Sequence, residues 1–145
     1  FITANPDEIA SLDSGATAGW NRTGLQFNAY AANASGTSPV CRFFSTAFAP
    51  KSSHFHTPFA SECAAVQANP NWLLESGAAF YIALPVGDGS CATGLTPVYR
   101  LYNNGQGGAP NHRYTTDVSV RAQAMKEGWM PEGLGPDAVE MCAPQ

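Results

Sequence analysis

The longest pattern in this sequence runs Pro97-Val98-Tyr99-Arg100-Leu101-Tyr102-Asn103, His112-Arg113-Tyr114-Thr115-Thr116-Asp117 and Gly128-Trp129-Met130-Pro131-Glu132-Gly133. An earlier version reads Pro39-Val40-Cys41-Arg42-Phe43-Phe44, His54-Phe55-His56-Thr57 and Asn71-Trp72-Leu73-Leu74-Glu75. The spacing agrees, because 15 residues separate Arg42 from Thr57 and again Arg100 from Thr115. The chain therefore contains an internal repeat of about 58 residues.

A third, shorter copy of the pattern lies at the start of the chain. Residues 1–8 match the segments at Thr57 and Thr115, and residues 19–24 match the Trp segments, but an opening strand with an arginine is absent. We predict one domain over residues 1–145, made of repeat 1 (1–38), repeat 2 (39–96) and repeat 3 (97–145). Repeat 1 is then incomplete, and a strand from an upstream segment or a neighbouring subunit would complete it.

The composition is typical of a secreted protein. Only 12% of the residues are charged, against about 25% in an average soluble protein, and Gly and Pro are frequent. The net charge of −4 gives no attraction to nucleic acid or to an anionic membrane surface. No apolar run approaches the ~18 to 20 residues that span a bilayer. We expect a secreted or surface protein without membrane insertion, cut from a larger chain or freed of a leader.

Four cysteines without a CxxC pair predict two disulfides rather than a zinc site. Cys41 and Cys63 both lie in repeat 2, and Cys91 and Cys142 bracket repeat 3. The simplest pairing is therefore Cys41–Cys63 with Cys91–Cys142. Four cysteines allow three pairings, and the sequence leaves the other two open.

Local patterns predict the elements of each repeat. Helices are expected over residues 6–12, 61–67 and 118–126, the first and third capped by Asn5 and Asp117. Strands are expected over residues 23–30, 40–44, 54–57, 78–84, 98–102 and 139–142, with residues 31–38 as a linker. Such short units must pack on one another. We therefore predict a compact α+β domain with approximate threefold pseudo-symmetry, β-trefoil-like or a related repeat arrangement.

The repeated blocks resemble the DUF5648-type repeat of secreted bacterial and fungal proteins, whose pattern is roughly PVYRxYN, HxYTTD and GWxxEG. Residues 98–133 match it almost completely, whereas repeat 2 departs at Cys41, at Phe44-Ser45 and at Ser76. The resemblance implies an accessory module of a secreted protein that binds carbohydrate or cell-envelope polymer.

Arg42 and Arg100 occupy the same position in two repeats. They could bind a ligand carboxylate or sugar hydroxyls, or they could pair inside the domain with Glu75 and Glu132, which also recur. Recurrence in every unit favours architecture. By the same reasoning we predict a structural role for the other recurring residues: Thr3, Thr57, Thr115, Trp20, Trp72, Trp129, His54 and His112.

Aromatic residues outside the repeat pattern are better ligand candidates, because aromatic faces stack on sugar rings. Four are predicted: Tyr30, Phe48, Phe59 and Tyr102. The possible metal cluster of His54, His56 and Glu62 is the weaker interpretation, because His54 has a repeat equivalent in His112, and no cofactor is expected. No catalytic activity is expected either, since Glu75 and Glu132 are equivalent rather than opposed carboxylates and no GxSxG segment occurs.

The sequence thus predicts a non-catalytic module that binds carbohydrate or cell-envelope polymer. The alternative is a structural, adhesion or filament subunit whose first repeat is closed by a strand from another chain or segment. An exposed aromatic surface would favour the first, and an edge strand paired in trans would favour the second.

Overall fold

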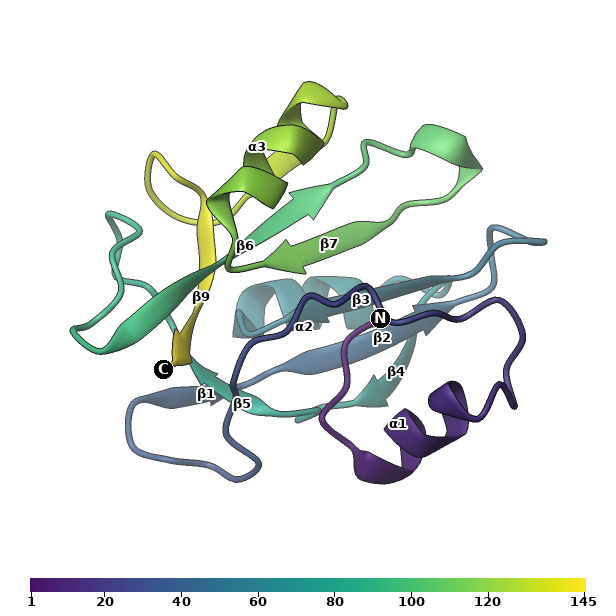
Figure 1. Ribbon diagram of the computed structural model, residues 1–145, viewed down its shortest axis with the longest axis horizontal. Coiled ribbons are helices and arrows are strands. Elements are labelled where there is room, and N and C mark those ends of the chain that lie inside the picture. Colours follow the sequence, from purple (N-terminus) through teal and green to yellow (C-terminus); the bar gives the residue numbers. More distant parts are fainter.

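The computed structural model describes residues 1–145 as three α-helices and two antiparallel sheets (Figure 1). The helices are α1 (Pro6–Asp13), α2 (Ala60–Gln67) and α3 (Val118–Lys126). The larger sheet has the order β1 (Thr37–Pro39), β5 (Tyr81–Ala83), β9 (Val139–Pro144), β6 (Leu95–Tyr102) and β7 (His112–Thr115), and β8 (Met130–Glu132) also pairs with β6. The smaller sheet has the order β3 (Ser53–Thr57), β2 (Cys41–Ser45) and β4 (Leu73–Ser76). The predicted α+β class is confirmed.

Helix starts follow their capping residues. The Asn5 side chain accepts hydrogen bonds from the backbone N–H groups of Asp7 and Glu8, and Asp117 does the same for α3. Phe59 precedes α2 without any side-chain cap. Because α1 has no buried residue, its cap and its ion pairs position it more than apolar packing does.

The strands of repeats 2 and 3 pair in the same way. β2 forms a hairpin with β3, and β6 forms one with β7, so that Arg42 faces His56 and Arg100 faces Tyr114. On the other side, β4 pairs with β2 and β8 pairs with β6. Each arginine therefore lies on the central strand of a three-stranded unit.

Several predictions about strands were wrong. Residues 23–30 form no strand, and only Tyr30 makes a bridge, to Tyr81. Phe27 and Ala29 pack against the core, but this segment has no partner strand of its own. The expected linker contains β1, while β4 and β8 were not predicted because three or four residues carry too short a pattern. The two sheets do not close into a barrel, so the related repeat arrangement replaces a β-trefoil.

The main core lies on the larger sheet, and the smaller sheet has its own cluster of Cys41, Phe43 and Phe55. The main core is built from seven buried residues: Val40, Phe80, Ile82, Val98, Tyr114, Met141 and Ala143. Both predicted disulfides are confirmed, Cys41–Cys63 linking β2 to α2 and Cys91–Cys142 tying the segment before β6 to β9. The helices give no membrane-spanning candidate, since none is both long and apolar enough.

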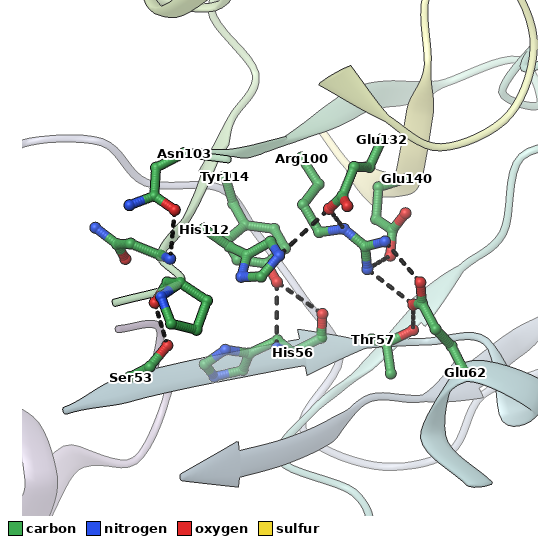
Figure 2. Close-up of polar contacts among 12 residues, drawn as sticks. Ser53, His56, Thr57, Glu62, Arg100, Asn103, His112, Tyr114, Glu132 and Glu140 are labelled. Atoms are coloured by element: carbon green, nitrogen blue, oxygen red, sulfur yellow. Dashed lines mark hydrogen bonds and ion pairs between the residues drawn. The ribbon is translucent and has the colours of Figure 1, made fainter. Parts of the chain in front are cut away.

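The Tyr114 hydroxyl links the larger sheet to the smaller one. The buried Tyr114 hydroxyl on β7 donates a hydrogen bond to the His56 carbonyl (2.7 Å) and accepts one from the His56 N–H (3.2 Å), as Figure 2 shows. The His56 ring in turn makes a 3.1 Å hydrogen bond to the Ile2 carbonyl. These two aromatic residues are 58 positions apart, so each repeat is tied to the backbone of the preceding one.

We expect Tyr114→Phe to lower the free energy of unfolding by about 1 to 3 kcal/mol, because it leaves a buried N–H and a buried C=O unpaired. Urea denaturation measures the change. Tyr102→Phe on the adjacent strand is the control, since the Tyr102 hydroxyl makes no hydrogen bond within the chain; its effect should stay within about 0.5 kcal/mol. Equal effects of the two changes would contradict this assignment.

Candidate functional site

The two recurring arginines lie at the junctions between repeats. Arg42 pairs with Glu8 of α1 (Nη2 to Oε1, 2.7 Å) and with Glu75 of β4 (Nε to Oε2, 3.1 Å). Arg100 pairs with Glu62 of α2 (Nη2 to Oε1, 2.8 Å) and with Glu132 of β8 (Nε to Oε2, 2.9 Å). Each guanidinium group therefore joins a helix of the preceding repeat to a strand of its own repeat.

The surroundings of the two arginines are also alike. Arg42 lies over the ring of Phe1 (5.2 Å to the centroid), and Arg100 lies over the ring of Phe55 (5.0 Å). The helix carboxylates are held by threonine hydroxyls of their own repeat, Thr3 on Glu8 and Thr57 on Glu62. Both guanidinium groups are largely buried and pair with carboxylates inside the chain, although the Nε atom of Arg42 has no hydrogen-bond partner of good geometry.

Arg100 has a further partner in Glu140 of β9 (Nη1 to Oε1, 2.5 Å; Figure 2). Glu140 is fully buried, and its Oε2 atom has no hydrogen-bond partner. Burial raises the pKa of Glu140 to about 8, and the Glu62 and Glu132 carboxylates add to the increase. One positive charge cannot balance three negative charges. The most buried of the three carboxyl groups, that of Glu140, therefore holds a proton at neutral pH.

A polar cleft of about 530 Å³ lies beside this framework. One wall is the β2–β3 turn, the second is the loop between β6 and β7, and the third is the start of the chain. Thirteen residues line it: Phe1, Trp20, Pro50, Lys51, Ser52, Ser53, His54, Asn103, Gln106, Gly107, Ala109, Pro110 and Asn111. We call it the first cleft.

Asn103 gives the β6–β7 loop its shape. Its buried amide donates to the carbonyls of Gln106 (2.8 Å) and Ala109 (3.0 Å) and accepts from the N–H groups of Gly105 and Asn111. Both N–H donors and the oxygen of the Asn103 amide are thus used inside the loop. Asn103 therefore positions the loop, and neighbouring side chains supply the polar groups that face the cleft.

The two loops that form the cleft are also bonded to each other. Ser53 donates to the Pro110 carbonyl (2.6 Å), and the Lys51 ammonium group contacts the Gly107 carbonyl. These contacts fix the two walls of the cleft relative to each other, although the two loops lie far apart in the sequence.

The aromatic wall of the first cleft is partly exposed. Trp20 is 38% exposed and Phe1 is 39% exposed, and their ring centroids are 5.5 Å apart. His54 packs on Phe1 at 4.7 Å, and burial lowers the pKa of His54 to about 4. His54 is therefore neutral at neutral pH, and Lys51 is the charged side chain of the lining.

A second, smaller hollow of about 260 Å³ adjoins the first at Pro110. Its lining comes from β3, α2, β6, β7, β8 and the segment after α2: Phe55, Val66, Trp72, Tyr102, Pro110, His112 and Glu132. We call it the second cleft.

The structure places the predicted ligand residues apart. Tyr102 lines the second cleft, and the Phe48 ring lies 6.2 Å from that of Trp72. Tyr30 is half-buried beside Tyr81, and Phe59 is half-buried at the start of α2. Tyr102 and Phe48 thus both lie near Trp72, whereas Tyr30 and Phe59 line neither cleft.

The imagined metal ligands diverge as well. His56 bonds the Ile2 carbonyl, His54 lies 3.5 Å from Glu75, and Glu62 binds Arg100. No group of three or more His, Cys, Asp and Glu side chains has an arrangement that could hold a metal ion.

Sequence reasoning missed the polar residues of the first cleft. Lys51, Ser52, Gln106 and Asn111 come from loops without a repeated pattern, and nothing in the sequence shows that these loops meet. The one available signal is the Gly-rich run 104–108, which marks a loop whose backbone can approach a neighbour closely.

These features define a disulfide-bonded α+β domain with recurring arginine-centred junctions. The family described as "Domain of unknown function (DUF5648)" matches residues 1–83 and 77–139, and the chain belongs to this family. Two overlapping matches are consistent with a repeat domain. No curated protein and no solved structure matches the chain.

We expect Arg100→Gln to reduce the free energy of unfolding by about 3 to 5 kcal/mol, since it removes the buried cation that pairs with Glu62 and Glu132 and the donor to the buried Glu140. Arg22→Gln is the matched control. Arg22 pairs with Asp13 on the surface, where its side chain is 68% exposed, and its loss should have little effect because solvent screens the pair. Chemical denaturation of both variants tests the difference, and a small effect at Arg100 would contradict the structural role.

The raised pKa of Glu140 should make the free energy of unfolding depend on pH. Between its ordinary pKa and about 8, the folded state keeps a proton that the unfolded state releases. The free energy of unfolding should therefore fall as pH rises through this range, by up to about 1.4 kcal/mol per pH unit from this group. Glu140→Gln should remove that part of the slope in urea denaturation from pH 5 to 9. Parallel curves for the two proteins would show that Glu140 is ionised when folded.

Proposed function

We propose that this domain binds a carbohydrate polymer in the first cleft, without catalysis, as an accessory module of a secreted or surface protein. The observation that carries the proposal is one cleft that combines a partly exposed aromatic wall with exposed polar side chains. Sugar rings offer both kinds of surface, because their C–H faces stack on aromatic rings and their hydroxyls exchange hydrogen bonds.

The aromatic wall supports stacking. Trp20 presents more than a third of its surface although it packs edge-on against Phe1. A rigid aromatic side chain loses little conformational freedom on binding, and its amphipathic character suits a wet, polar ligand.

The opposite side of the cleft supports hydrogen bonding to hydroxyl groups. Ser52, Gln106 and Asn111 are exposed there. The side-chain amide of Asn111 makes no hydrogen bond inside the chain, and that of Gln106 makes only a long one, 3.5 Å, to the Gly128 carbonyl. Amides and hydroxyls both donate and accept, which matches the alternating demands of sugar hydroxyls. Because Asn103 holds the β6–β7 loop in shape, the backbone at Gln106 and Asn111 loses little conformational freedom when a ligand binds.

The two disulfides support an extracellular location for the proposed module, since disulfides persist in oxidising compartments. The alternative function, a subunit completed by a strand in trans, stays a prediction. On the free edge of β3, the Tyr114 hydroxyl already occupies both backbone groups of His56. This disfavours strand addition at the β3 edge, whereas the alternative places the added strand at repeat 1.

Trp20→Ala should weaken binding to carbohydrate at least tenfold, equivalent to about 1.4 kcal/mol. The measurement is retention on insoluble chitin, cellulose and peptidoglycan, followed by titration with soluble fragments of the polymer that is bound. Trp129→Ala is the control, because Trp129 has the equivalent repeat position but packs on Arg113 away from both clefts.

The expected result is that the Trp129→Ala variant binds like the wild type, even if it unfolds more easily. The proposal is wrong if the wild type is retained on none of these polymers, or if Trp20→Ala has no more effect than Trp129→Ala.

A further inference from the structure

The second cleft repeats the aromatic arrangement of the first. In the first cleft, Phe1 packs against Trp20 (5.5 Å, 70° between ring planes) and His54 (4.7 Å, 63°). In the second cleft, Phe55 packs against Trp72 (6.2 Å, 63°) and His112 (4.8 Å, 65°). Both triplets combine a Phe and a Trp of one repeat with the His of the next, so the second cleft is the repeat equivalent of the first.

The second cleft also has polar groups that the fold does not use. The ion pair of Glu132 with Arg100 and its contact with His112 both involve its Oε2 atom, which leaves Oε1 free to accept. The Tyr102 ring is stacked on His112, and its hydroxyl makes no hydrogen bond within the chain. The partly exposed Trp72, with a carboxylate and a phenol beside it, could receive a sugar unit in the way that we propose for the first cleft.

We propose that the second cleft is a second carbohydrate site, so that one chain binds two sugar segments. This inference rests on the proposed function of the first cleft. The two sites open on opposite sides of β3, since successive strand residues face opposite ways: His54 lines the first cleft and Phe55 lines the second.

Charge limits the kind of sugar that both sites accept. The first cleft carries the Lys51 ammonium group, and the second carries the Glu132 carboxylate. An acidic sugar would suit the first and be repelled by the second, so the common ligand is uncharged. Two sites on one rigid domain would bind a neutral polysaccharide with more avidity than either site alone.

Calorimetric titration with neutral trisaccharides tests the inference. N-acetylglucosamine trimer, cellotriose and mannotriose are each used alone, because a short sugar can fill only one cleft at a time. We expect two equivalents bound by the wild type and one by Trp20→Ala or by Trp72→Ala. The double variant should bind none and should be lost from the insoluble polymer.

Tyr102→Phe keeps the test valid if Trp72→Ala fails to fold. It removes only a free hydroxyl and should weaken the second site about threefold while leaving the first unchanged. One equivalent in the wild type, or a second equivalent that survives both Trp72→Ala and Tyr102→Phe, would overturn the second site but not the proposed function. No binding of any trisaccharide or polymer would overturn both.

Discussion

The structure depends on a guanidinium group placed between carboxylates that come from two repeats. Arg100 joins α2, β8 and β9 through Glu62, Glu132 and Glu140, and Arg42 joins α1 and β4 in the equivalent way. Short helices without a strong apolar face could not dock firmly by burial alone. A planar, permanently charged fork that bonds two carboxylates at once supplies the orientation that packing lacks.

The linkage follows one rule between successive repeats and then stops. The Arg of one repeat lies over a Phe of the preceding repeat and pairs with its helix carboxylate. An aromatic side chain of the same repeat, His56 or Tyr114, hydrogen-bonds a backbone carbonyl of the preceding repeat. In repeat 3, Arg113 stands where Phe1 and Phe55 stand, and Val120 stands where Glu8 and Glu62 stand. Arg113 packs on Trp129 instead, so this surface has neither the carboxylate nor the ring for another arginine.

The clefts follow from the same linkage. Because the His and the Phe–Trp pair come from adjacent repeats, a hollow forms at each junction, and its depth depends on the loops beside it. At the first junction, Ser53 and Lys51 contact the β6–β7 loop that Asn103 shapes, and the hollow is wide and polar. At the second, Tyr102 and Glu132 make a smaller hollow with a more apolar lining.

Much of the fold could be predicted from the sequence by itself, because local chemistry acts over a few residues. The caps Asn5 and Asp117 set helix starts, and the simplest of three possible cysteine pairings is the one that the structure has. Recurrence favoured a structural role for Arg42 and Arg100 over ligand binding, and both make ion pairs inside the chain. Tertiary structure alone decided the rest. The strand expected over residues 23–30 has no continuous partner, the third carboxylate on Arg100 comes from 40 residues away, and the clefts arise where distant loops meet. Such contacts depend on which repeats become neighbours in space, which no local pattern specifies.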